Sequence, residues 1–283
     1  MKAGYIGLGH IGRDMARELV KSGRDTIVFD VMPEGPAELA RLGARTAASS
    51  AEVARDSDVI GLCVRTDQQV LDVIGGENGI LSTAKPGTLI TIHSTVRPST
   101  VHAAARLAEA KGVRVVDAPV SRGSLEREGK IIIYMLSGKD ADIETAKLFV
   151  EPSAKQIVVA GPLGAAMALK ICNNLVTYLE FLAASEADKL ARRSGLDPAL
   201  LLSVMSGNGN ATPSMQGMMK NRLSMTGEPT GPARTAFEGF AAIAEKDLDC
   251  ALEVAREVGL DLPGALLARA QIRDVYLGSP DGK

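Results

Sequence analysis

The first residues whose types and spacing suggest chemistry are three glycines near the N-terminus, in the pattern G-x-G-x-x-G. Gly7, Gly9 and Gly12 follow a short apolar run and open a helix-favouring segment. The first glycine permits a tight turn, the second lets the backbone approach a pyrophosphate, and the third lets helix and strand pack closely. A helix N-terminus also offers free N–H groups and a partial positive charge to phosphates. The spacing therefore predicts a dinucleotide site, which also includes the intervening Leu8, His10 and Ile11.

A carboxylate ends the second predicted strand. Asp30 lies 18 residues beyond Gly12, where an acidic side chain accepts hydrogen bonds from the adenosine ribose. Its charge would repel a 2′-phosphate, and residues 31–33 contain no Arg or Lys. We therefore expect NAD rather than NADP as the cofactor. The alternative is a structural glycine turn in which Asp30 only caps a helix.

A lysine within a long apolar stretch is the next candidate. Lys170, Asn174 and Thr177 are spaced i, i+4 and i+7, which places them on one stripe of a helix. A buried lysine needs an acceptor or a cavity, and a cleft beside a cofactor would supply both. Lys170 is then a candidate general acid and base. From the periodicity alone, a snorkelling lysine or one paired with a structural carboxylate is equally open.

Two further segments follow predicted strands, at the carboxyl edge of the sheet where ligands bind in such folds. Residues 117–124 are rich in turn formers and contain Ser121, Arg122 and Gly123. Ser94 and Thr95 end another strand. The alternatives are an ordinary loop for the first segment and helix capping for the second.

The elements that would position these residues divide the chain in two. Apolar or β-branched runs alternate with helical patterns up to Gly161, which indicates a doubly wound, mostly parallel Rossmann-type α/β sheet. A helix-favouring stretch without proline then covers 164–193. Its part 165–184 is apolar almost all round, so we expect that part to be buried between the domains. Beyond it only helices and loops are predicted. We expect a dinucleotide-binding domain at 1–162, and a linking helix with an all-helical domain at 163–283. The predicted strands are 3–7, 26–30, 58–64, 88–93, 113–117, 130–137 and 156–159.

Composition excludes several classes of function. The 283 residues carry a net charge of −2, so neither nucleic acid nor an anionic membrane is an expected partner. No apolar run is long enough to span a membrane, and the N-terminus is not a signal peptide, so we expect a cytoplasmic protein. Cys63, Cys172 and Cys250 are too scattered for disulfides or a zinc site, and we expect no metal. All three are predicted to be small core residues.

Four motifs together resemble those of the β-hydroxyacid dehydrogenase family, whose members include 3-hydroxyisobutyrate dehydrogenases and semialdehyde reductases. They are IGLGHIG, DAPVSRG, GPLGAAMALKICNN and EKDLDCA, in the family's order and spacing. The resemblance covers essentially the whole chain. It implies a dinucleotide domain, a linking helix and a helical domain, assembled as a homodimer or homotetramer. It also implies hydride transfer between NAD(P) and a small anionic 3-hydroxy acid or semialdehyde.

The resemblance also implies roles for particular residues. Lys170 matches the family's catalytic lysine. Thr95 matches a residue that lines the site, and we include it among the cofactor-binding residues. Lys246 matches a lysine that closes over cofactor and substrate, although its helical phase places it nearer the polar face. The residues that match the family's substrate-carboxylate site are Ser121, Gly123 and Asn174.

Two departures from the family pattern affect these expectations. Arg122 stands where the family usually has glycine, and it either enters the cleft to bind a second anionic group or pairs outward with Glu126 or Glu128. Val64 and Arg65, included in the cofactor site, stand where the family usually has an aliphatic residue followed by proline, so Arg65 is the departure. Two other functions stay open, an imine reductase and a non-catalytic scaffold. Imine reductases typically lack a lysine at the position of Lys170.

Overall fold

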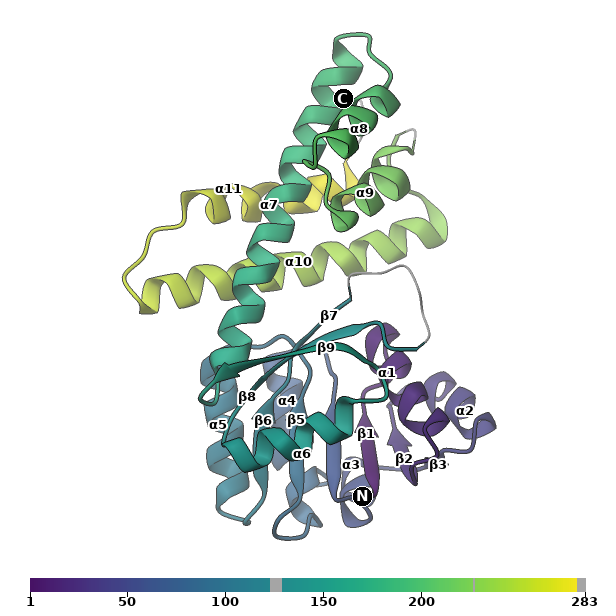
Figure 1. The fold of residues 1–283 in the computed structure, drawn as a ribbon, viewed down its shortest axis with the longest axis vertical. Helices are drawn as coiled ribbons and strands as arrows, with labels where there is room; N and C mark the ends of the chain where they lie inside the picture. Colours follow the sequence, from purple (N-terminus) through teal and green to yellow (C-terminus); the bar gives the residue numbers. More distant parts are fainter. Residues whose placement is uncertain (123–128, 226, 279–283) are drawn as a thin grey trace. The chain divides into compact units, whose positions relative to one another are not determined.

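The computed structural model describes residues 1–122, 129–225 and 227–278 (Figure 1). The chain forms two compact units, Met1–Lys170 and Ile171–Lys283, called here the N-terminal and C-terminal units. The division falls inside one long helix, α7 (Ala165–Arg193). The predicted domain boundary between residues 162 and 163 lies just before this helix and stays a prediction.

The N-terminal unit is built on one sheet with the order β3-β2-β1-β4-β5-β6-β8-β7, and β9 pairs with β8. The neighbours from β3 to β6 are all parallel. By contrast, β8 runs antiparallel to β6 and β7. The order reverses between β1 and β4, the point at which doubly wound sheets bind ligands. The strands are β1 (Ala3–Ile6), β2 (Thr26–Phe29), β3 (Arg45–Thr46), β4 (Val59–Leu62), β5 (Leu89–Ile92), β6 (Arg114–Asp117), β7 (Val120–Arg122), β8 (Ile132–Ser137) and β9 (Ala154–Gly161).

Helices follow most of the parallel strands, as short βα crossovers require. Several begin with a recognisable cap: Thr66 and Gln69 form a capping box at the start of α4, and Pro98 opens α5. The helical segments are α1 (His10–Lys21), α2 (Glu34–Arg41), α3 (Ser50–Arg55), α4 (Asp67–Gly75), the 3₁₀ turn η1 (Ile80–Ser82), α5 (Pro98–Glu109) and α6 (Asp140–Val150).

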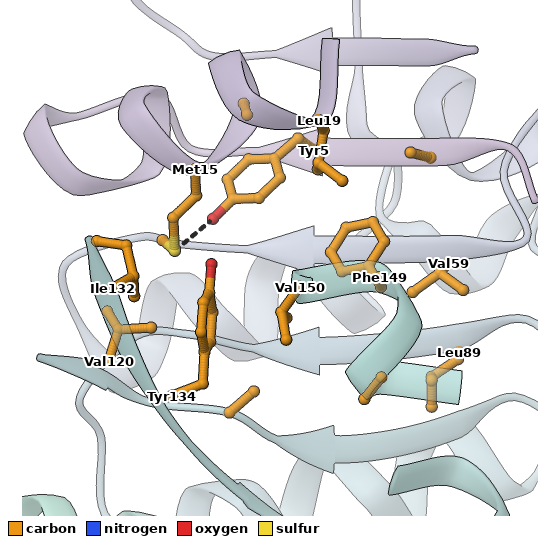
Figure 2. Close-up of a cluster of buried hydrophobic side chains, with 14 of the residues drawn as sticks. Tyr5, Met15, Leu19, Val59, Leu89, Val120, Ile132, Tyr134, Phe149 and Val150 are labelled. Carbon is orange, nitrogen blue, oxygen red and sulfur yellow. Dashed lines mark hydrogen bonds between the residues drawn. The ribbon is translucent and has the colours of Figure 1, made fainter. Parts of the chain in front are cut away.

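Two apolar cores cover the two faces of this sheet. Val59 of β4 belongs to one buried cluster with Met15 of α1 and Phe149 of α6 (Figure 2). The next residue along β4, Ile60, belongs to a second cluster with Val101 of α5. Successive side chains of a strand point to opposite faces, so strands buried on both sides need helices on both sides. This accounts for the nearly continuous apolar runs in the sequence.

The C-terminal unit contains most of α7 together with shorter and longer helices. Its core joins α7, α10 and α11 through residues such as Tyr178, Leu248 and Ile272. Between residues 171 and 278, position 226 aside, the structure has no strand. Among the described residues, no helix combines the length and apolar character that a membrane span needs. The remaining segments are α8 (Pro198–Gly207), α9 (Pro213–Met218), the π-helical η2 (Met219–Leu223), α10 (Gly231–Glu257) and α11 (Pro263–Leu277).

The predicted fold class is confirmed, and each of the seven predicted runs contains a strand. Two short strands were missed. β3 has only two residues, and β7 lies in the segment that we interpreted as a turn. β7 forms because Ser121 pairs with Ile133 of β8, a partner distant in the sequence. Local patterns do not contain that pairing information.

Two expectations about burial were wrong. Cys172 is exposed and Cys63 is half-buried, so only Cys250 is the fully buried core residue that we expected of all three. The apolar stretch of α7 is not buried on every side, because Leu169 and Val176 are 40% and 57% exposed. Apolar composition alone does not determine which face of a helix is covered.

Candidate active site

The turn between β1 and α1 requires two of its three glycines for reasons within the protein. Gly7 has φ +89°, and a Cβ there would lie 2.2 Å from the carbonyl oxygen of Cys63 on the neighbouring strand. A Cβ on Gly12 would lie 2.1 Å from the carbonyl oxygen of Gly7. Backbone atoms cannot yield at such distances. These glycines therefore fix the tight turn and bring α1 close to β1.

Gly9 is different, because nothing among the described residues excludes a side chain there. Its φ is −61°, and a Cβ would meet no atom of that part of the chain within 4 Å. Gly9 is exposed, as is His10, and no described side chain caps the N-terminus of α1. A glycine in this place leaves room for a group outside the protein to reach the backbone N–H groups. The turn therefore fits a bound pyrophosphate.

Asp30 holds this turn from the end of β2. One carboxylate oxygen accepts the N–H of Leu8, and the other accepts the N–H of Met32 at 2.8 Å. The next helix has Pro33 at its N-cap, so Asp30 does not cap it. Each carboxylate oxygen can accept a further hydrogen bond. Asp30 therefore both orders the glycine turn and keeps acceptors for a ribose.

The strand ends beside the turn contain the other predicted cofactor residues. Val64 is half-buried, and its N–H donates to Ser94 Oγ at 2.8 Å. Arg65 is exposed, and its N–H donates to the side chain of Gln69. Thr95 is half-buried. Because Arg97 is the N-cap of α5, neither Ser94 nor Thr95 caps that helix.

Residues 117–124, the segment that we assigned to substrate binding, include β7. In the structure, Arg122 of β7 has an unexpected partner. Arg122 Nη1 donates to Asp14 Oδ2 of α1 at 2.9 Å, and Asp14 also pairs with Arg17. Gly123, Glu126 and Glu128 lie outside the described residues. A surface depression of about 220 Å³ surrounds this pair, and its other lining residues are His10, Arg13, Arg17 and Glu38.

On α7, the structure supports the predicted burial of the two polar candidates. Lys170 and Asn174 are each 8% exposed, and they lie one turn apart on the helix. Thr177 is half-buried, and its hydroxyl donates to the carbonyl of Asn173 in the same helix. Lys170 is the last residue of the N-terminal unit, and Asn174 belongs to the C-terminal unit.

In the C-terminal unit, Asp247 brings together two of the predicted substrate residues. Its carboxylate accepts from Asn174 Nδ2 at 2.6 Å, from Tyr178 Oη at 3.1 Å and from Lys246 Nζ at 2.7 Å. Asp247 is 2% exposed. Burial, and then the nearby Asp247 charge, raise the pKa of Tyr178 well above its usual value, so its hydroxyl stays a donor.

Sequence reasoning missed Asp247, and also Asp117 at the end of β6. Asp117 ends an apolar run, RVVDA, whereas Asp247 lies among charged neighbours, EKDLD. A carboxylate that interrupts a buried run needs donors, so the interruption was an available signal for Asp117, and Asp247 had no such signal. Within the described parts of the chain, no cluster of side chains fits a metal ion.

His93 is a buried residue that directly follows β5 and contacts the backbone between β6 and β7. Its Nδ1 bonds the carbonyl of Ala118 at 2.8 Å, and its Nε2 bonds Thr91 Oγ1 at 3.0 Å. The ring stacks on Tyr5 and Phe149. Burial lowers the pKa of His93 to about 4, which keeps it neutral at physiological pH.

Comparison with known proteins identifies relatives of both halves of the chain. Residues 2–161 match the NAD-binding domain of 6-phosphogluconate dehydrogenase, and residues 164–279 match the NAD-binding domain of NADP-dependent 3-hydroxyisobutyrate dehydrogenase. A probable mitochondrial 3-hydroxyisobutyrate dehydrogenase of Dictyostelium discoideum is 35% identical over 90% of this chain and 79% of its own. The 2-(hydroxymethyl)glutarate dehydrogenase of Eubacterium barkeri is 32% identical over 95% of this chain and 87% of its own.

A solved structure is similar over almost the full length. The Mycobacterium tuberculosis 3-hydroxyisobutyrate dehydrogenase, determined with L-serine, has a TM-score of 0.77 and 28% identity. The similarity covers 98% of this chain and 95% of that one.

Proposed function

Because this chain belongs to the β-hydroxyacid dehydrogenase family, we propose that it transfers a hydride between NAD and a small 3-hydroxy acid. The chain is an oxidoreductase with NAD(P)-binding domains. The observation that carries the finer proposal is Lys170, a lysine 8% exposed on α7 that by resemblance matches the family's catalytic lysine. Its presence favours an alcohol–carbonyl couple over imine reduction.

The cofactor would be held at the β1–α1 turn. The N–H groups at the start of α1 would donate to its pyrophosphate beside Gly9, and Asp30 would accept from the ribose hydroxyls. When bound, the nicotinamide accepts or supplies the hydride. Asp30 supports NAD as the preferred dinucleotide, because a carboxylate repels the phosphate that distinguishes NADP.

Lys170 is proposed to move the proton. In oxidation of the alcohol, its amine accepts the hydroxyl proton while the hydride leaves the carbon. In reduction of the carbonyl, its ammonium donates a proton to the forming alkoxide. The other polar residues of α7 and α10 would bind rather than react. By family resemblance, Asn174 and Lys246 are proposed substrate-binding residues, and so are Ser121 and Gly123.

The side-chain geometry of the C-terminal unit supports that role for Asn174. Its amide gives one N–H to Asp247 and has a second N–H to offer. Arg122 is engaged by Asp14, so a second anionic group on the substrate would compete with that ion pair. We therefore propose a monocarboxylate as the preferred substrate, and a dicarboxylate as a weaker one.

A substrate panel with both dinucleotides tests this function. The panel contains 3-hydroxyisobutyrate, glycerate, serine and 2-(hydroxymethyl)glutarate, each with NAD and NADP, followed by the absorbance of the reduced cofactor. We expect turnover of a 3-hydroxy monocarboxylate with NAD. Failure of every hydroxy acid and of the matching semialdehydes in reverse would exclude the proposal.

We also propose that the protein works in the cytoplasm as a homodimer or homotetramer, with no metal. Light scattering of the purified chain measures the oligomer directly. A monomer at micromolar concentration would contradict this part of the proposal.

A further inference from the structure

Asp117 is a carboxylate with no exposure to solvent, at the last position of β6. It lies opposite Ser137 of β8 across the sheet, and the Ser137 hydroxyl donates to Asp117 Oδ1. A buried carboxylate is tolerated only where several donors meet it. The groups that donate to Asp117 therefore show which part of the structure it fixes in place.

The other donors are backbone groups at the start of α7. Gly164 N–H donates to Asp117 Oδ1, and Met167 N–H donates to Asp117 Oδ2, each at 2.9 Å. Between them, Ala166 N–H donates to Ser137 Oγ, also at 2.9 Å. The fourth N–H of this turn, that of Ala165, donates to the carbonyl of Pro162. All four N–H groups that a helix leaves without internal partners are therefore satisfied by the protein.

This arrangement differs from an ordinary N-cap, because the capping side chain is distant in the sequence. Asp117 lies 47 residues before Gly164 and 50 before Met167. A local cap moves with its helix, whereas this cap belongs to the sheet. Two carboxylate oxygens on two N–H groups fix both the translation and the rotation of the helix. Lys170 follows Met167 by three residues, within the next turn.

The same carboxylate begins the segment that leads to Ser121. Ala118 N–H donates to the carbonyl of Ile92, and the Ala118 carbonyl bonds His93 Nδ1, each at 2.8 Å. The carbonyl of Pro119 accepts from Met135 N–H at 3.0 Å. The path from Asp117 to β7 thus has few free backbone groups and little room to shift.

We propose that Asp117 is a positioning residue that sets Lys170 relative to the Ser121 segment, through the first turn of α7. The proposal rests on the proposed function of Lys170. Asp117 touches neither substrate nor cofactor in this scheme. Its effect passes through backbone hydrogen bonds, so its loss should change the placement of the lysine more than the binding of the dinucleotide.

The test compares Asp117→Asn with Asp142→Asn. Asp142 is also a buried carboxylate in the first turn of a helix, α6, and it pairs with Arg114 at 2.7 Å. It lies outside the proposed machinery, so it reports what the loss of a buried carboxylate does in general. In Asp117→Asn the amide offers one acceptor where two are needed, and its NH2 group faces an N–H.

We expect kcat to fall about a hundredfold in Asp117→Asn, the usual cost of misplacing a reacting group by about 1 Å. The Kd for NADH should change less than about threefold, since the glycine turn is untouched. The solvent deuterium isotope effect on kcat should increase, because proton transfer by Lys170 becomes slower. Asp142→Asn should leave kcat and the isotope effect at parent values, even with a similar loss of thermal stability.

Two readouts do not depend on activity. Hydrogen exchange of the Gly164, Ala166 and Met167 amides should speed up at least tenfold in Asp117→Asn alone. The rate at which trinitrobenzenesulfonate modifies Lys170, located by peptide mass, should change in the same variant. Unchanged exchange and unchanged labelling would overturn the proposal.

The two sets of readouts also separate this inference from the proposed function. If the parent turns over no hydroxy acid, the dehydrogenase proposal fails, and exchange and labelling still decide whether Asp117 positions Lys170. If the parent is active and Asp117→Asn lowers kcat no more than Asp142→Asn does, Asp117 is only a structural cap and the inference is wrong.

Discussion

Two buried carboxylates hold successive parts of α7, and they do so by different means. Asp117, in the N-terminal unit, accepts mainly backbone N–H groups from Gly164 and Met167. Asp247, in the C-terminal unit, accepts side-chain donors, from Asn174, Tyr178 and Lys246. The first therefore fixes where the helix backbone lies, and the second fixes where individual side chains point.

The difference has a functional meaning. A fixed backbone sets where a side chain begins, whereas hydrogen bonds to its polar end set where the side chain points. Lys170 follows Met167 of the backbone-fixed turn by three residues, so its placement depends on that turn. Asn174 and Lys246 are held at their polar ends, which suits groups that bind a carboxylate. Variants at either location should therefore affect different kinetic constants.

Replacing Lys170 gives the reference effect for this comparison. Lys170→Ala should lower kcat by about two to four decades, the usual contribution of a positioned acid–base group. NADH binding should survive, as measured by fluorescence titration. Lys189→Ala is the control, since Lys189 lies on the same helix in an exposed pair with Asp274. Turnover within a few fold of the parent would remove Lys170 as the proton-transfer group and leave Asp117 with nothing to position.

His93 bonds the carbonyl of Ala118, the residue after Asp117, and it should make the free energy of unfolding depend on pH. Its folded pKa of about 4 lies below the unfolded value of about 6.5, so the unfolded chain binds more protons between these values. The stability that neutral His93 provides is present above pH 6.5 and is lost as the pH falls towards 4, by at most about 3 kcal/mol. Urea unfolding at pH 7.5, 6 and 5 measures this loss. It should be absent in His93→Phe, and an equal slope for both proteins would contradict this account.

Asp247→Asn should weaken binding more than chemistry. The variant keeps two acceptor lone pairs but loses the charge that holds Lys246 and orients Asn174. We expect KM for the hydroxy acid to rise about tenfold and kcat to change less, since a charge-assisted hydrogen bond contributes about 1.5–3 kcal/mol. Asp249→Asn is the matched control, an exposed carboxylate two residues on that pairs with Arg269. A fall in kcat with an unchanged KM would contradict this account, because Asp247 would then affect the chemical step, as Asp117 is expected to do, rather than substrate binding.

Asp30 extends the comparison to the cofactor, because it also accepts backbone N–H groups. Asp30→Ser should shift the ratio of kcat/KM for NAD over NADP by about tenfold towards NADP, by removing both an acceptor and a repulsive charge. Asp25→Ser, at the residue just before β2, should leave this ratio unchanged. A parent that prefers NADP would contradict our choice of cofactor.

Arg122 gives the smallest expected effect, because Asp14 already engages its guanidinium. Arg122→Gly should lower kcat/KM for 2-(hydroxymethyl)glutarate by about threefold to tenfold and leave kcat/KM for 3-hydroxyisobutyrate unchanged. The reason is that only a second anionic group on the substrate competes with Asp14 for the Arg122 guanidinium. Arg122→Lys should fall between parent and Gly. Equal changes for both acids would assign Arg122 to the ion pair with Asp14 alone.

Much of the fold and part of the site could be predicted from local patterns. The glycine turn, the strand ending at Asp30 and the lysine helix all have signals within about twenty residues, because turns, strands and helices have fixed periods. The strand β7 and the pairing of Arg122 with Asp14 have no such signal. Each depends on a partner far away in the chain, so no window of sequence contains both halves of the contact.

The sequence by itself determined the alternation of strands and helices, the residues of the glycine turn and the presence of a lysine on an apolar helix. Only the tertiary structure decided what holds that helix, because Asp117 reaches Gly164 and Met167 through the sheet, and Asp247 reaches Asn174 from α10. The physical reason is the cost of burying a carboxylate. An acidic residue in an apolar run shows that donors are needed, but only the folded chain supplies them and so decides what the carboxylate holds.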